Sequence, residues 1–129
     1  MARAELDYDF VVVDPEEVTS PRTVGFIEQC RQIQGDRPFP RWSDFKLYEL
    51  PSKVIPYATV ADVGPGPADF IYRFWGTGHT SLKGVDLTGR RVDAIPAAAL
   101  ARIGVRQFQL VCEERRPLVF VHTLRAYGP

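Results

Sequence analysis

The chain has 129 residues, of which 45% are hydrophobic and 25% are charged, a composition typical of one globular domain. This composition excludes a disordered chain, a collagen-like chain and a small protein held together by disulfides. The 16 basic and 16 acidic residues cancel. Because no cationic excess is present to neutralise phosphates, we expect neither nucleic acid nor a membrane surface as a partner.

The sequence predicts a cytoplasmic protein. Its longest apolar runs, residues 11–13 and 97–101, are far shorter than the ~20 residues of a membrane-crossing helix. The N-terminal sequence MARAELDYDF is acidic and lacks the apolar core of a signal peptide. In a reducing cytosol we expect Cys30 and Cys112 to be buried, unpaired thiols.

The first part of the chain predicts a strand followed by an amphipathic helix. Residues 8–13 (YDFVVV) are β-branched and aromatic, which is typical of a strand. Ser20 and Pro21 suit the N-cap and the first position of a helix over residues 21–34. The narrow apolar stripe of this helix fits either the outside of its own domain or a partner helix. The stripe consists of Phe26, Ile27, Cys30 and Ile33.

The middle of the chain predicts a loop and an antiparallel hairpin. Residues 35–45 contain two prolines and no periodicity, which indicates a loop. Strands are predicted over residues 56–63 and 69–75, joined by the GPGP turn at 64–67. Strand alternation predicts one face with Phe70, Tyr72 and Phe74, and an opposite face with Ile71, Arg73 and Trp75.

The last part of the chain completes an α+β pattern. Four glycines divide the segment after residue 75 into short helical turns and loops. A long helix is predicted over residues 97–114, and a strand over residues 118–126. Because the strands are joined mostly by hairpins, we expect an antiparallel sheet with helices packed on one face.

Two side-chain contacts are also predicted. Arg73 is placed to form a cross-strand ion pair with Asp62. Asp86 and Thr88, followed by Gly89, are typical of a turn that a side chain stabilises.

Three stretches in order resemble the bacterial PAS-like sensor domains: FPRWSDF (39–45), LPSKVIPYATVADV (50–63) and FIYRFWGTGHTSLKGVDLTGRRV (70–92). They are similar to the proteobacterial branch with the pattern YRxxGT…G-x-DLTG-R. The likeness extends over roughly residues 10–126. The matching residues are Phe70, Tyr72, Arg73, Gly76, Thr77, Gly84, Asp86, Leu87, Thr88, Gly89 and Arg90, with Arg41 and Asp44 upstream.

This resemblance implies a five-stranded antiparallel sheet whose helical face encloses a ligand pocket. Residues 1–36 would form an N-terminal strand and a flanking helix, and residues 37–129 the PAS-like domain. PAS domains end with three strands after the long helix, whereas only residues 118–126 follow it here, so the C-terminal strands are incomplete. Either the N-terminal strand and a partner chain fill the open edge, or the chain is a shortened version.

The expected ligand site is the space between the apolar face of the sheet and the long helix. Its candidate ligand-binding residues are Tyr72, Phe74, His79, Phe108, Phe120 and His122. The same aromatic residues would alternatively fill a dry core. The cofactor stays unknown, and a role as haem or metal ligand stays open for His79 and His122. The sequences EQCRQ and LVCEE around the cysteines lack the flavin-adduct motif of light-sensing relatives, which argues against a photosensory cysteine. Two histidines and two distant cysteines do not supply a closed zinc site.

We therefore expect a PAS-like sensory or regulatory module that binds a small molecule, dimerises, or does both, without catalysis of its own. In PAS-like proteins the flanking helix commonly packs against its copy, so a homodimer is the expected assembly. Two alternatives stay open. One is a structural dimerisation adaptor with a filled core, and the other is a small α+β enzyme with His79 or His122 as its base.

Overall fold

The structure is a computed structural model that describes the backbone of residues 5–127, with the side chains of that range except those of residues 5–8, 83 and 124–127. The elements in chain order are β1 (Glu5–Val13), α1 (Pro21–Gln34), β2 (Thr59–Val63), β3 (Phe70–Trp75), α2 (Thr77–Lys83), α3 (Ala98–Glu114) and β4 (Val119–Tyr127). Short 3-10 turns connect several of them. The fold is mixed α+β, as the sequence predicts, and the helix over residues 21–34 has the predicted bounds.

The strands form two separate antiparallel sheets, so the expectation of one continuous sheet is wrong for the described residues. β1 pairs with β4 along its whole length, from Glu5 opposite Tyr127 to Val13 opposite Val119. We call this pair the ribbon. β2 and β3 form the predicted hairpin. The ribbon joins the first and the last strand. A boundary at residue 36 would therefore place β1 in one domain and its partner β4 in the other.

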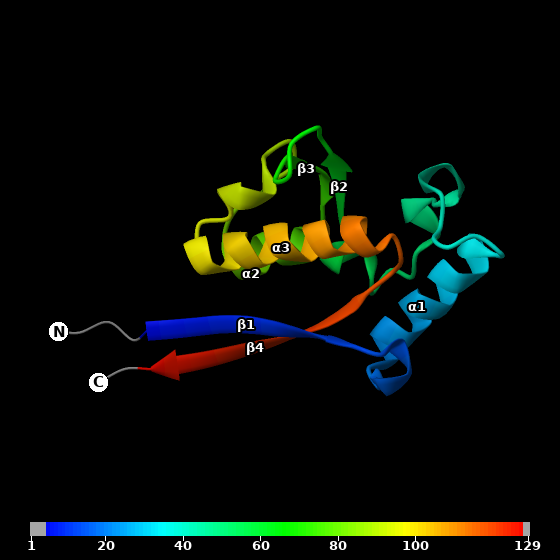
Figure 1. Cartoon of the computed structure of the whole chain (residues 1–129), viewed down its shortest axis with the longest axis horizontal. Helices are drawn as coiled ribbons and strands as arrows, with labels where there is room; N and C mark the ends of the chain where they lie inside the picture. The colour runs from blue at the N-terminus through cyan, green and yellow to red at the C-terminus, as the bar shows by residue number, and fades with distance from the viewer. Residues whose placement is uncertain (1–4, 128–129) are drawn as a thin grey trace.

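α3 lies between the ribbon and the hairpin, which explains why the two sheets do not merge (Figure 1). On one side, Phe108 stacks on Phe70 of β3 with ring centroids 5.4 Å apart. On the other side, Gln107 contacts His122 of β4. Burial of apolar surface on the hairpin side forms the core, which consists of Phe70, Tyr72, Trp75, Leu87 and Val92 with Ala61, Val85, Ala94, Ile95, Val105 and Phe108 packed against it.

A β-bulge in the hairpin overturns the predicted alternation of β3. Val60 pairs with Phe74 but Ala61 pairs with Tyr72, so Arg73 is an extra residue between the two pairs. The bulge turns Trp75 to the same face as Tyr72, and their ring centroids are 4.8 Å apart. Trp75 is therefore a buried core residue rather than a residue of the outer face.

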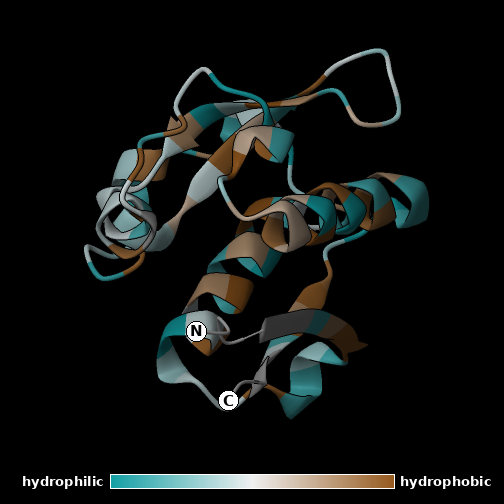
Figure 2. Ribbon diagram, turned by 90° about the vertical axis from the view of Figure 1, so that its left-hand side faces the viewer, coloured by the Kyte–Doolittle hydropathy of each residue, from teal (hydrophilic) through white to brown (hydrophobic). Residues whose placement is uncertain are grey.

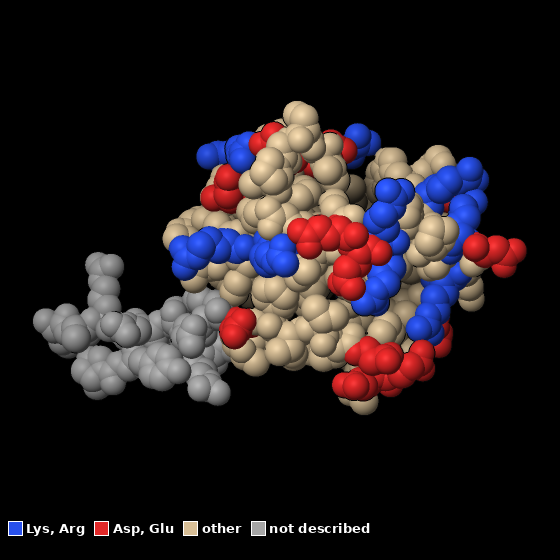
Figure 3. Space-filling model, in the orientation of Figure 1, with Lys and Arg blue, Asp and Glu red and all other residues tan. Residues whose placement is uncertain are grey.

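The predicted polar contacts are confirmed. Arg73 Nη2 lies 2.8 Å from the Asp62 carboxylate across the hairpin. Asp86 Oδ1 accepts hydrogen bonds from the Thr88 amide at 2.9 Å and from the Thr88 hydroxyl at 2.7 Å. Acidic and basic side chains are interspersed on the face seen in Figure 3. Within the described residues, no helix is both long enough and apolar enough to cross a bilayer.

Candidate functional site

Two of the six residues expected to bind a ligand, Tyr72 and Phe108, meet in the packed core. The Tyr72 ring lies edge-on to Trp75 and to Phe108, with a centroid distance of 6.3 Å to the latter. Burial raises the pKa of the Tyr72 hydroxyl to about 12. Side chains thus fill the space where β3 and α3 meet at Tyr72. Phe74 is half-buried, two residues from Tyr72 across the bulge.

Phe120 and His122 lie on the ribbon, on the opposite side of α3. The ring of Phe120 packs edge-on against Phe10 at a centroid distance of 5.3 Å. Gln107 Nε2 donates a hydrogen bond to His122 Nε2 at 2.7 Å. His122 is exposed. The ribbon therefore does not bring these two residues to Tyr72.

His79 belongs to α2 and lies against the turn that precedes β2. Its Nε2 donates a hydrogen bond to the Tyr57 carbonyl at 2.7 Å. Its ring centroid lies 5.1 Å from Trp75 and 6.2 Å from Tyr57. The six predicted residues therefore occupy separate places, and they do not line one common cavity.

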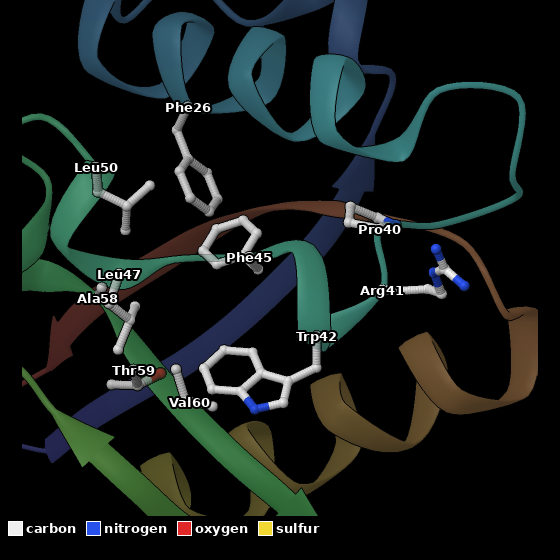
Figure 4. Close-up of a pocket in the computed structure, with 10 residues that line it drawn as sticks. All are labelled: Phe26, Pro40, Arg41, Trp42, Phe45, Leu47, Leu50, Ala58, Thr59 and Val60. Carbon is white, nitrogen blue, oxygen red and sulfur yellow. The ribbon is translucent and has the colours of Figure 1, made fainter.

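An apolar groove of about 270 Å³ lies elsewhere, between α1, the segment 40–50 and the start of β2 (Figure 4). Phe26 reaches toward it from α1, while Trp42 and Phe45 extend from the opposite wall. Trp42 is 48% exposed, so part of its surface faces the open side of the groove. The full lining is Phe26, Pro40, Arg41, Trp42, Phe45, Leu47, Leu50, Ala58, Thr59 and Val60.

Local sequence explains how this groove forms. Prolines at positions 38, 40 and 51 prevent a regular helix, so residues 42–44 and 47–49 form isolated 3-10 turns. These turns place Trp42 and Phe45 with ring planes 17° apart and centroids 6.3 Å apart. Phe26 meets Phe45 edge-on at the same distance. Three aromatic rings therefore border a space that no side chain fills.

Charged groups border the groove on one side. Asp44 accepts hydrogen bonds from Arg37 at 2.8 Å and from Arg41 at 3.2 Å, so one carboxylate holds two guanidinium groups. The Arg73 guanidinium carbon lies 5.8 Å from the centre of the Trp42 ring, within the range of a cation–π contact. The groove thus combines aromatic walls with a rim of ion-paired charged groups, which suits a small, mostly apolar molecule.

The cysteines differ from their predicted burial. Cys30 is half-buried, and this burial raises the pKa of its thiol, whereas Cys112 is exposed. Among the described residues, no group of histidine, cysteine and carboxylate side chains is arranged to hold a metal ion.

Sequence reasoning missed the groove because its aromatic residues lie in a segment without periodicity. The sequence places Trp42 and Phe45 in a loop that is part of the PAS-like pattern, and Phe26 on the apolar stripe of the helix over residues 21–34. Their proximity depends on long-range packing that no local pattern encodes. The available signal was the presence of two large aromatic residues inside a proline-rich loop, since loops often carry binding residues.

No protein-family model, curated protein or solved structure matches this chain. The proposals below therefore rest on its own residues and on the sequence resemblance given above.

Proposed function

We propose that this chain is a cytoplasmic, PAS-like sensory or regulatory module that binds a small apolar molecule in the groove of Figure 4 and does not catalyse a reaction. The observation that carries this proposal is the open apolar groove bordered by Phe26, Trp42 and Phe45. Pockets for small molecules are concave, mostly apolar and equipped with few polar groups. The resemblance to PAS-like sensor domains supports the same class of function.

The groove offers a route from ligand to signal, because α1 forms one of its walls. α1 contains no fully buried residue. Its contacts with the rest of the chain include the Phe26–Phe45 ring contact, a hydrogen bond from Gln29 to the Glu49 carbonyl and an ion pair between Arg31 and Glu16. A helix held by few contacts responds when a ligand enters beside Phe26. Occupancy would thereby shift the population of α1 positions.

A thermal-shift screen with indole, naphthols and medium-chain fatty acids tests this function. A molecule at about 100 times its Kd raises the free energy of unfolding by about 2.7 kcal/mol. We expect at least one class of probe to stabilise the natural protein. Val60→Trp, which fills the groove, should abolish the shift. Val121→Trp, on the exposed ribbon, is the matched control and should keep it.

Two results would contradict the proposal. One is that no probe stabilises the natural protein. The other is that Val60→Trp, shown to be folded by its circular dichroism, responds to the same probes as strongly as the Val121→Trp control.

A structural dimerisation adaptor is the second candidate function. The ribbon favours it, because three of its valines are about half-exposed: Val11 at 54%, Val12 at 45% and Val121 at 46%. Val11 and Val121 are cross-strand partners, so they form one exposed apolar pair, and exposed apolar side chains that lie together are typical of interaction surfaces. In Figure 2 hydrophobic segments, coloured brown, occur in strands as well as in helices. An adaptor would dimerise without binding any of the probes, which separates it from the sensor.

A further inference from the structure

The hairpin has one open edge, on β2. The far edge of β3 is already occupied by the segment 89–91: Gly89 N–H donates to the Tyr72 carbonyl at 2.7 Å, and Tyr72 N–H donates to the Arg90 carbonyl at 2.9 Å. Ile71 and Arg91 form an isolated β-bridge beside these bonds. Among the described residues, no strand pairs with the outer side of β2. Further strand pairing is therefore open only on β2.

Hydrogen bonds at both ends of β2 fix which backbone groups point outward. Gly76 N–H donates to the Ala58 carbonyl at 3.0 Å, and Gly64 N–H donates to the Asp69 carbonyl at 2.6 Å. In an antiparallel pair, inward-pointing and outward-pointing residues alternate. The amides and carbonyls of Thr59, Ala61 and Val63 therefore point away from β3. No described residue bonds to these groups.

We propose that β2 of a second copy of this chain pairs antiparallel with this edge, with a two-fold axis at Ala61. Thr59 then faces Val63 of the second copy, Ala61 faces Ala61, and Val63 faces Thr59. Each of these three pairs exchanges two N–H···O bonds, because all of the residues involved point outward. Two hairpins, each of a size that is marginal alone, become one four-stranded sheet.

The edge is self-complementary in charge. In this register Asp62 falls opposite Val60 of the second copy, so no like charges meet. The Asp62 carboxylate is already paired with Arg73 of its own hairpin at 2.8 Å. A central Ala61 presents the smallest side chain of the strand at the axis. The contact is isologous, so it closes at two copies and does not propagate into a fibre.

The same register covers the groove. Gly64 of the second copy falls opposite Ala58, one of the lining residues. Val63 and Gly64 of the second copy then lie beside Thr59 and Ala58, at the wall of the groove. The turn at residues 64–67 folds back toward β3 and α3 of its own copy, where the Pro67 carbonyl accepts a hydrogen bond from Gln109. Each copy thus places the end of its β2 beside the groove of the other.

The ribbon is a less suitable place for the second copy. On β1, the side chain of Asp9 accepts the Phe10 N–H at 2.7 Å, which removes one donor from that edge. Pairing at the edge of β4 would leave the valines of the ribbon face uncovered. The β2 contact rests on strand geometry, and it does not require that the groove bind a small molecule.

Sedimentation equilibrium over a concentration series, with amide exchange measured by NMR, tests the proposal. The natural chain should dimerise, and Ala61→Pro should not. Proline removes an N–H that makes no bond within the chain, so an edge strand tolerates it. Val121→Lys, which changes the ribbon, should dimerise like the natural chain. At high concentration the amides of Thr59, Ala61 and Val63 should become protected.

Several outcomes would overturn the proposal. The natural chain could remain monomeric up to its solubility limit. Val121→Lys could abolish the dimer while Ala61→Pro, folded by circular dichroism, retains it. If Ala61→Pro does not fold, the exchange rates of the natural chain test the proposal instead. Equal exchange rates of the Thr59, Ala61 and Val63 amides at low and high concentration would contradict pairing at this edge. Ligand binding in the groove is measured separately, so the two proposals fail independently.

Discussion

Gly76 occupies the junction between β3 and α2, where the backbone of the turn before β2 passes very close. Its N–H donates to the Ala58 carbonyl at 3.0 Å. A side-chain carbon at this position would meet the carbonyls of Pro56 and Ile55, the latter at 2.8 Å. Backbone atoms cannot rotate aside as the end of a flexible side chain does. Glycine is therefore required here by close approach rather than by an unusual backbone conformation.

Gly76→Ala should lower the free energy of unfolding by about 1–3 kcal/mol, because overpacking forces the backbone to shift. Gly25→Ala is the matched control. Gly25 lies within α1 with nothing near its added carbon, so alanine should stabilise the protein by up to about 1 kcal/mol. Urea unfolding measures both variants. Equal stability of the two variants would mean that the contact at Gly76 relaxes without cost.

At the scale of elements, the sequence predicted every helix and strand of the fold, although for α2 it indicated only short helical turns and loops. Their assembly was less accessible, because it depends on residues distant in sequence. The hairpin followed from alternation and the GPGP turn, but the extra residue Arg73 reversed the predicted face of Trp75. The single sheet failed because α3 separates the ribbon from the hairpin. The groove was missed because it is built from a loop, a helix and a strand end.

One ion pair connects the hairpin turn to the segment that borders β3. Asp69 accepts a hydrogen bond from Arg91 at 2.9 Å and another from the Gly66 amide at 2.9 Å. The hydrogen bond from Arg91, with smaller contributions from Gly66 and from the charge of Arg91, lowers the pKa of Asp69 below its ordinary value of 3.8. The ionised form of Asp69 is therefore more stable in the folded chain than in the unfolded chain, and its ionisation stabilises the fold.

Acid should remove this contribution. It is fully present above pH 3.8, the pKa of the unfolded carboxyl, and it is lost as the pH falls through the lower pKa of the folded state. Asp69→Asn should therefore show a shallower loss of stability below pH 4 than the natural chain, in urea titrations at each pH. Glu28→Gln, which changes an exposed side chain on α1 that forms no ion pair with a described residue, serves as the control and should keep the natural slope. An unchanged slope in Asp69→Asn would contradict this assignment.

At the scale of the whole molecule, the two proposals share one surface. A small molecule in the groove and the end of β2 of a second copy would both lie against Ala58 and Thr59. Binding of one therefore opposes binding of the other, and the two affinities are linked reciprocally. This linkage would let a ligand control the oligomeric state without any catalytic step.

Val60→Trp should weaken the dimer about tenfold, a change of about 1.4 kcal/mol, because in this register the larger ring stands opposite Asp62 of the second copy. The dissociation constant from sedimentation equilibrium measures this effect, with Val121→Trp as the control of equal bulk. Equal dissociation constants for the two variants would contradict this register.

The pairing of β1 with β4 has a consequence for synthesis on the ribosome. The strand with Val11, Val12 and Val13 emerges first, but its partner follows only about a hundred residues later. At about 5–20 residues per second, the delay is roughly 5–20 s. During that time the β-branched segment of β1 has no native partner, so we expect it to be a binding site for chaperones. The ribbon can close only after β4 has been synthesised.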